Sequence, residues 1–135
     1  MSSDVKASAK PVKIPGPEHP ITIEHNPHRV LIRLTGQIIA DTREALTLRE
    51  ANYPAVLYIP RKDTDMVRLT RSDHATYCPY KGDCAYLSIP EGGERLVNAV
   101  WTYENPYPAV AQIKDYLAFY PDRVDIVEEP VQDQA

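Results

Sequence analysis

The chain has 135 residues, a length that fits one domain with a sizeable core. Its 15 Lys and Arg residues and 19 Asp and Glu residues give a formal net charge of −4, and the basic residues are scattered, which argues against a nucleic-acid partner held through phosphates. No stretch approaches the ~18 consecutive apolar residues of a membrane span, and no secretory leader stands out, so we expect a cytoplasmic protein without membrane contact.

Residues 1–19 carry Pro and Gly but no apolar periodicity, so we expect a disordered or loosely draped tail. Beyond it, apolar residues alternate over 29–34 and return at 38–41 after a Gly-Gln pair, which predicts a hairpin. The segment 41–52 is ambiguous. Its acidic residues at 41 and 44 are typical of a helix capping box, whereas Leu46 and Leu48 alternate with polar residues as in a strand, and we favour the strand.

Further short strands are predicted, each bounded by turn residues, at 56–59, 66–70, 85–89, 97–103 and 124–127. One clear helix is expected near 107–120. Val110, Ile113 and Leu117 recur there with helical spacing, and Pro121 ends the pattern.

These elements predict one α+β domain over residues 20–128, built mainly from an antiparallel β-sheet bent around a cleft, with an acidic tail at 129–135. The only two cysteines, Cys78 and Cys84, are expected to be free thiols. No Cys-x-x-Cys or His-x-x-x-His pattern supplies further ligands, so we expect no bound metal and no cofactor.

Reactive side chains concentrate in the segment 69–89, which reads as a hairpin. Because side chains alternate along a strand, His74, Thr76 and Cys78 are expected on one face, about 7 Å apart per two residues. Lys81 is expected at or beside the tip, in the turn that Pro79 begins. The sequence therefore places its candidate site on this hairpin.

Cys78 is the candidate nucleophile, with His74 as its base and Lys81 as a nearby cation. Each of these residues also has a plain structural interpretation. Cys78 would then be a small buried strand residue, His74 a hydrogen-bonded strand residue, and Lys81 a solvated loop charge.

Aromatic residues supply a candidate binding wall. Trp101, Tyr103 and Tyr58 are candidates for stacking on a planar ligand, although they could equally be core or rim aromatics. Arg49 is a candidate for binding a carboxylate, with a surface ion pair to Glu50 as its structural alternative. The chain holds nine tyrosines and one phenylalanine, which favours a polar-lined cavity over a dry aliphatic core.

Five segments carry a resemblance to a known family: 36–43, 48–50, 53–60, 73–82 and 99–106. They resemble the family called domain of unknown function 427, also labelled nucleotidyltransferase-like, and the similarity covers roughly residues 20–128. The resemblance implies a compact domain of mostly antiparallel sheet with few helices. The label implies metal-dependent nucleotidyl transfer, for which Asp63 and Asp65 have the carboxylate spacing, but the Gly-Ser loop usual in such enzymes is not nearby.

Three functional hypotheses stay open at this point, and whether the chain is an enzyme stays open with them. The first is a small-molecule binding domain that holds an anionic or planar metabolite in a cleft built on the His74–Lys81 hairpin, with Cys/His chemistry as an option. The second is a non-enzymatic interaction module that binds a protein or forms a homodimer. The third is the nucleotidyl transfer that the family label suggests.

Overall fold

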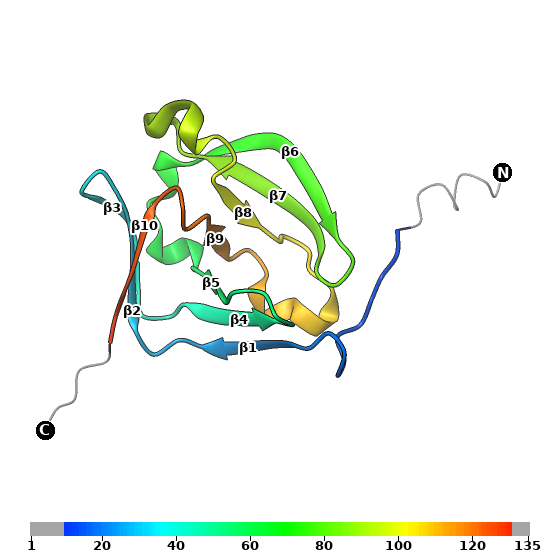
Figure 1. Cartoon of the computed structure of the whole chain (residues 1–135). Coiled ribbons are helices and arrows are strands. Elements are labelled where there is room, and N and C mark those ends of the chain that lie inside the picture. Colours follow the sequence, from blue (N-terminus) through cyan, green and yellow to red (C-terminus); the bar gives the residue numbers. More distant parts are fainter. Residues whose placement is uncertain (1–9, 131–135) are drawn as a thin grey trace, which may run out of the picture.

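The computed structural model describes residues 10–130, which form three antiparallel β-sheets joined by short 3-10 helices (Figure 1). The strands are β1 (Ile21–His25), β2 (Arg29–Leu34), β3 (Gln37–Thr42), β4 (Leu46–Glu50), β5 (Val56–Tyr58), β6 (Thr70–Cys78), β7 (Gly82–Ser88), β8 (Val100–Thr102), β9 (Leu117–Phe119) and β10 (Asp125–Glu129). The 3-10 helices are η1 (Arg61–Asp63), η2 (Met66–Arg68), η3 (Pro90–Leu96) and η4 (Pro108–Ile113). Within 10–130 no helix is long and apolar enough to cross a membrane.

The first sheet has the strand order β10-β2-β3. β2 and β3 form the hairpin that the sequence predicts, and β2 has the predicted bounds. Thr35 and Gly36 make the turn with positive φ angles of 47° and 81°, the conformation of a tight two-residue hairpin loop. β10 pairs with the other edge of β2, where Ile126 lies opposite Ile32.

The second sheet has the order β1-β4-β5 and places strand β4 in the segment 41–52, as predicted. Leu48 lies opposite Ile23 on one side and Val56 on the other. The alternation along β4 turns Leu48 and Glu50 to one face of the sheet and Arg49 to the opposite face. Glu50 is half-buried and Arg49 is exposed.

The third sheet has the order β6-β7-β8-β9 and contains the predicted hairpin. Cys78 and Gly82 form its last pair, and the register shifts between Arg71 and Ala75. Gly82 has φ of +109°, and a side chain there would lie 3.4 Å from the Asn105 carbonyl oxygen, so only glycine fits this turn without strain. β9 also joins the second sheet, through two backbone hydrogen bonds between Ile59 and Leu117 of 2.7 and 2.8 Å.

The predicted helix near 107–120 is wrong. The segment instead forms the 3-10 helix η4 and then strand β9, with Val110 (φ −126°) interrupting the helical geometry and Asp115 (φ 67°) separating the two elements. Val110, Ile113 and Leu117 are all fully buried, which explains their spacing without an α-helix. The predicted strand at 66–70 is also wrong over most of its length, because residues 66–68 form η2.

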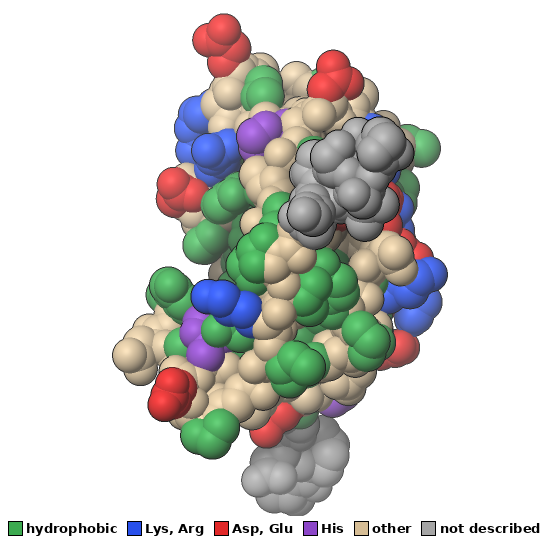
Figure 2. Space-filling model, turned by 90° about the vertical axis from the view of Figure 1, so that its right-hand side faces the viewer, with side chains coloured by type: hydrophobic (Ala, Val, Ile, Leu, Met, Phe, Trp, Pro, Cys, Tyr) green, Lys and Arg blue, Asp and Glu red, His purple; other side chains and the backbone are tan. Residues whose placement is uncertain are grey.

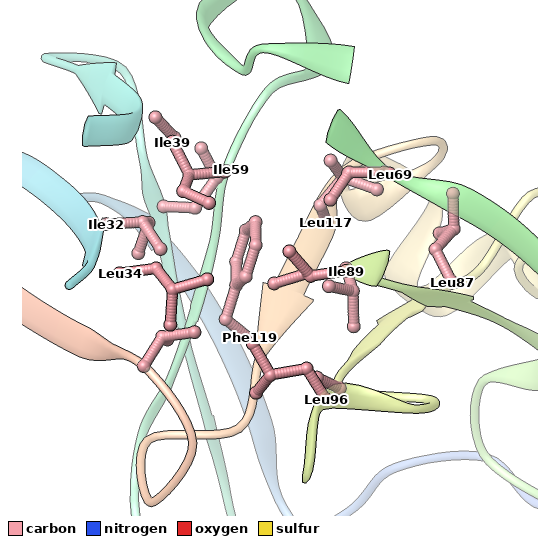
Figure 3. Close-up of a cluster of buried hydrophobic side chains, with 14 of the residues drawn as sticks. Ile32, Leu34, Ile39, Ile59, Leu69, Leu87, Ile89, Leu96, Leu117 and Phe119 are labelled. Atoms are coloured by element: carbon pink, nitrogen blue, oxygen red, sulfur yellow. The ribbon is translucent and has the colours of Figure 1, made fainter. Parts of the chain in front are cut away.

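Two clusters of buried side chains hold the sheets together. The aliphatic core comprises Val30, Ile32, Leu34, Ile39, Ala40, Ala45, Ile59, Leu69, Leu87, Ile89, Leu96, Ala99, Val100, Leu117, Phe119 and Val124. Phe119 stands in the middle of this core (Figure 3). The tyrosine cluster comprises Leu48, Tyr58, Cys84, Tyr86, Tyr103, Val110, Ile113 and Ala118. The candidate site lies beside the second cluster.

Candidate functional site

A cavity of about 710 Å³ borders the tyrosine cluster. Its aromatic lining comes from four different parts of the chain: Tyr53, Tyr58, Tyr86, Trp101, Tyr103, Phe119 and Tyr120. The ring centroids of Trp101 and Tyr120 are 4.5 Å apart at an interplanar angle of 50°. Trp101 is the only tryptophan in the chain. These rings give the cavity flat apolar surfaces with polar edges.

The phenols of Tyr58, Tyr86 and Tyr103 stay protonated over the neutral range. Burial raises the pKa of Tyr86 to about 12, and it also raises the pKa values of Tyr58 and Tyr103. The Tyr58 hydroxyl accepts a hydrogen bond from the indole Nε1 of Trp101 at 3.4 Å. The wall therefore offers neutral hydroxyl groups as hydrogen-bond donors and acceptors.

The cavity lining also contains three charged residues, Glu50, Lys81 and Glu128. Lys81 is 7% exposed, and its ammonium group donates to Oε1 of Glu50. The same Nζ lies 3.8 Å from Sγ of Cys78, another lining residue. The backbone holds Lys81 in place, because its N–H donates to the Cys78 carbonyl and its own carbonyl accepts from the Tyr107 N–H at 3.0 Å. Glu50 compensates the charge of Lys81, which would be costly to bury without a carboxylate partner.

Glu50 is shared between two basic groups. Its second oxygen, Oε2, lies 2.7 Å from Nε2 of His19, whose ring stacks on Tyr80 with centroids 4.0 Å apart and an interplanar angle of 3°. Burial acts to raise the pKa of Glu50, but the hydrogen bonds from Lys81 and His19 together outweigh it and hold that pKa below its ordinary value. Glu50 is therefore a carboxylate at neutral pH, with one basic neighbour on each oxygen.

His19 reaches this position because residues 10–19 run along the hairpin tip. The Lys13 N–H donates to the Pro79 carbonyl at 2.9 Å, and Lys10 forms an ion pair with Asp83 at 2.8 Å. Figure 2 views the molecule from this side, where hydrophobic side chains gather in the middle of the face. Residues 1–9 of the predicted tail lie outside the described residues. His19 is not among the site residues predicted from the sequence; its one signal there is a histidine between prolines at 17 and 20.

The structure does not bring His74 to Cys78. His74 is exposed, and its ring packs against Tyr86 with a centroid distance of 4.5 Å. Thr76 contacts the same tyrosine, with 2.9 Å between Oγ1 and the phenol oxygen. Both residues contact Tyr86, which lines the cavity, but neither His74 nor Thr76 lines the cavity itself. The nucleophile hypothesis for Cys78 stays a prediction, with Lys81 as the basic group in contact with the sulfur.

The remaining predicted ligand-binding residues fall in two places. Trp101, Tyr103 and Tyr58 line the aromatic cavity. Arg49 lines a separate cavity of about 320 Å³ on the opposite face of β4. The expected Arg49–Glu50 ion pair does not form, since Glu50 pairs with Lys81 and His19.

The residues suggested for metal-dependent nucleotidyl transfer have other partners. Asp63 accepts hydrogen bonds from Thr42 at 2.7 Å and from Lys62 at 3.4 Å. Asp65 pairs with Arg68 at 3.0 Å. Over residues 10–130, His, Cys, Asp and Glu form no group of three or more that could hold a metal ion.

Comparison with protein families gives one match. A family model described as "Domain of unknown function (DUF427)" matches residues 22–130. Comparison with curated proteins gives no match. The match covers every residue that lines the aromatic cavity, and His19 precedes it.

Proposed function

We propose that this chain, which belongs to the DUF427 family, binds a small planar molecule in the aromatic cavity. The observation that carries the proposal is the buried Lys81–Glu50 pair at the wall of a cavity otherwise lined mainly by aromatic and aliphatic side chains. The rings would hold the flat part of the ligand, and Lys81, Glu50 and Cys78 would meet its polar end.

The size and lining of the cavity support this class of ligand. A volume of about 710 Å³ lies within the range of roughly 300–1,000 Å³ that small-molecule sites occupy. Trp101, Tyr120, Tyr58 and Tyr86 all line the cavity, and a tyrosine ring combines an apolar face with a polar hydroxyl group. A planar ring system with a few polar substituents matches such walls better than a flexible chain does.

The burial of the ion pair supports a binding role, because a buried ion pair is a costly way to stabilise a protein interior. Removing two charges from water costs several kcal/mol, and apolar residues of similar volume often serve stability as well or better. Lys81 and Glu50 nevertheless occupy the wall, with side chains only 8% and 15% exposed. A recognition role for the pair accounts for its place in the cavity.

The proposal is tested with N-phenyl-1-naphthylamine, a neutral planar fluorophore. Because Trp101 is the only tryptophan and lines the cavity, we expect the probe to quench protein emission saturably with a stoichiometry of one. Replacing Tyr120→Leu removes an aromatic wall and should weaken binding about fivefold, since ring contacts contribute about 1 kcal/mol beyond buried area.

The matched control is Tyr107→Leu. Tyr107 is also half-buried, but its hydroxyl lies 2.6 Å from that of Tyr77 and it does not line the cavity. This variant should bind the probe as the unchanged protein does. Unsaturable quenching, or an equal loss in both variants, would contradict the proposal.

A further inference from the structure

We infer that the cavity selects a planar anion and that His19, acting through Glu50, takes up one proton when the anion binds. The inference rests on the proposed function and names the charge of its ligand. It also makes His19, which does not line the cavity, the residue that sets this preference.

The geometry behind it is a row of three groups of alternating charge. Glu50 uses one oxygen for Lys81 and the other for His19, so the three side chains follow one another from the cavity wall to the N-terminal segment. Lys81 is the member of the row that lines the cavity together with Glu50, and His19 is the member behind them. A charge change at His19 is therefore passed to Lys81 through a carboxylate that both share.

The charge of the row depends on His19. With a neutral imidazole, Lys81 and Glu50 cancel, and an anion in the cavity would be repelled by Glu50 and by Glu128, the second lining carboxylate, more than Lys81 attracts it. With a protonated imidazole the row carries one net positive charge. The charge of Glu50 is then still balanced by His19 when the Lys81 ammonium group contacts a bound anion. An anionic ligand then completes the alternation of charges, which favours proton uptake at His19.

His19 is placed to exchange that proton. Its side chain is 25% exposed, so the ring has access to water while it contacts Glu50. The groups that face it are Glu50 from β4, Tyr80 from the hairpin turn in a stacked arrangement, and the Tyr53 ring at 6.4 Å. From the N-terminal segment, the Lys13 ammonium lies 5.9 Å from the centre of the Tyr80 ring.

A second histidine provides the matched control. His28 lies 3.3 Å from Oε2 of Glu128, which also lines the aromatic cavity. Residues 10–130 thus contain two half-exposed histidines that each lie next to a cavity carboxylate, and of these two only His19 shares its carboxylate with Lys81. The inference assigns the proton uptake to His19 alone.

The experiment compares two probes of one framework, 8-anilinonaphthalene-1-sulfonate and its uncharged parent N-phenyl-1-naphthylamine, between about pH 5 and 8. The sulfonate should bind more tightly at low pH and weaken as the pH rises, by up to about tenfold per pH unit. The uncharged probe should bind with little pH dependence. Calorimetry of the sulfonate in two buffers of different ionisation enthalpy should give an uptake approaching one proton.

His19→Gln should remove both the pH dependence and the proton uptake, because an amide can donate to Glu50 but cannot carry a charge. His28→Gln should retain both. Thermal unfolding and binding of the uncharged probe show that each variant keeps its fold and its cavity.

Three results would overturn the inference: equal pH dependence of both probes, an unchanged sulfonate profile in His19→Gln, or loss of the profile in His28→Gln. In each of them the uncharged probe still binds and the proposed function stands. If neither probe binds at any pH, the proposed function itself fails.

Discussion

The aliphatic core and the tyrosine cluster are two buried regions of one small domain with different chemistry. No member of the aliphatic core carries a polar side-chain atom, and Val30, Ile59 and Leu96 are fully buried within it. The tyrosine cluster contains three tyrosines and Cys84, and it borders a cavity. Close packing without polar atoms maximises stability, whereas a polar-edged wall next to open space leaves room for a ligand.

The difference suggests that the two regions divide stability and binding between them. β9 contributes to both, since Leu117 and Phe119 belong to the aliphatic core and Ala118 to the tyrosine cluster. The alternation of side chains along that short strand is what keeps the regions apart. Variants that affect one region and spare the other therefore test this division.

The largest effect is expected in the aliphatic core. Ile32→Ala should lower the free energy of unfolding by about 2–5 kcal/mol, because it removes a side chain that is 1% exposed and leaves a cavity. Urea unfolding measures this loss, and the folded fraction should still bind N-phenyl-1-naphthylamine with unchanged affinity. Val67→Ala, at a side chain that is 90% exposed, should change stability by less than about 0.5 kcal/mol. A similar loss in both would contradict the assignment of stability to this core.

An intermediate, pH-dependent effect is expected at Glu50. Its folded-state pKa is lowered, so its contribution to stability is present above the ordinary glutamate pKa of about 4.3 and is lost as the pH falls through the folded-state value. Glu50→Gln should cost about 1–3 kcal/mol at neutral pH, because Lys81 loses its carboxylate.

The measurement is urea unfolding of both proteins from pH 7 down to acid. The gap in stability between wild type and Glu50→Gln should narrow on acidification, since the variant lacks the titrating group. A gap that stays constant with pH would show that the ion pair is not the source of the difference.

The smallest effect on stability is expected at the cavity wall. Tyr58→Phe removes the hydroxyl that accepts the Trp101 indole hydrogen bond and should cost about 1 kcal/mol or less. It should nevertheless change Trp101 emission, which fluorescence spectra of the folded protein measure. Tyr77→Phe, outside the cavity lining, should leave the emission unchanged. A large loss of stability in Tyr58→Phe would instead show that the cavity wall, like the aliphatic core, contributes substantially to folding stability.

Much of the strand framework could be predicted from the sequence, because alternation and turn residues act locally. β2 follows from its alternating apolar residues, and the Gly36 turn follows from the φ angles that glycine accepts. The segment 107–120 could not be predicted in this way. Val110, Ile113 and Leu117 have helical spacing, yet a 3-10 helix followed by a strand buries them equally well.

The candidate site was harder to predict because its charges meet over long sequence separations. A lysine in a turn is usually solvated, and nothing near Lys81 in the sequence indicates that Glu50, 31 residues earlier, covers it. His19 lies another 31 residues before Glu50, in a segment without periodicity. The strand pattern did place Cys78 and Lys81 on one hairpin, but it could not show that the structure keeps His74 away from the sulfur.

The position of His19 has a consequence for where the working unit of this chain begins. The family match starts at residue 22, and every cavity-lining residue falls inside it. A chain shortened to residues 22–130 would retain the complete wall and the Lys81–Glu50 pair, yet it would lack the imidazole that occupies the second oxygen of Glu50. The family match thus begins three residues after His19. A ligand screen on the shorter chain would use a site in which Glu50 has lost one of its two basic partners.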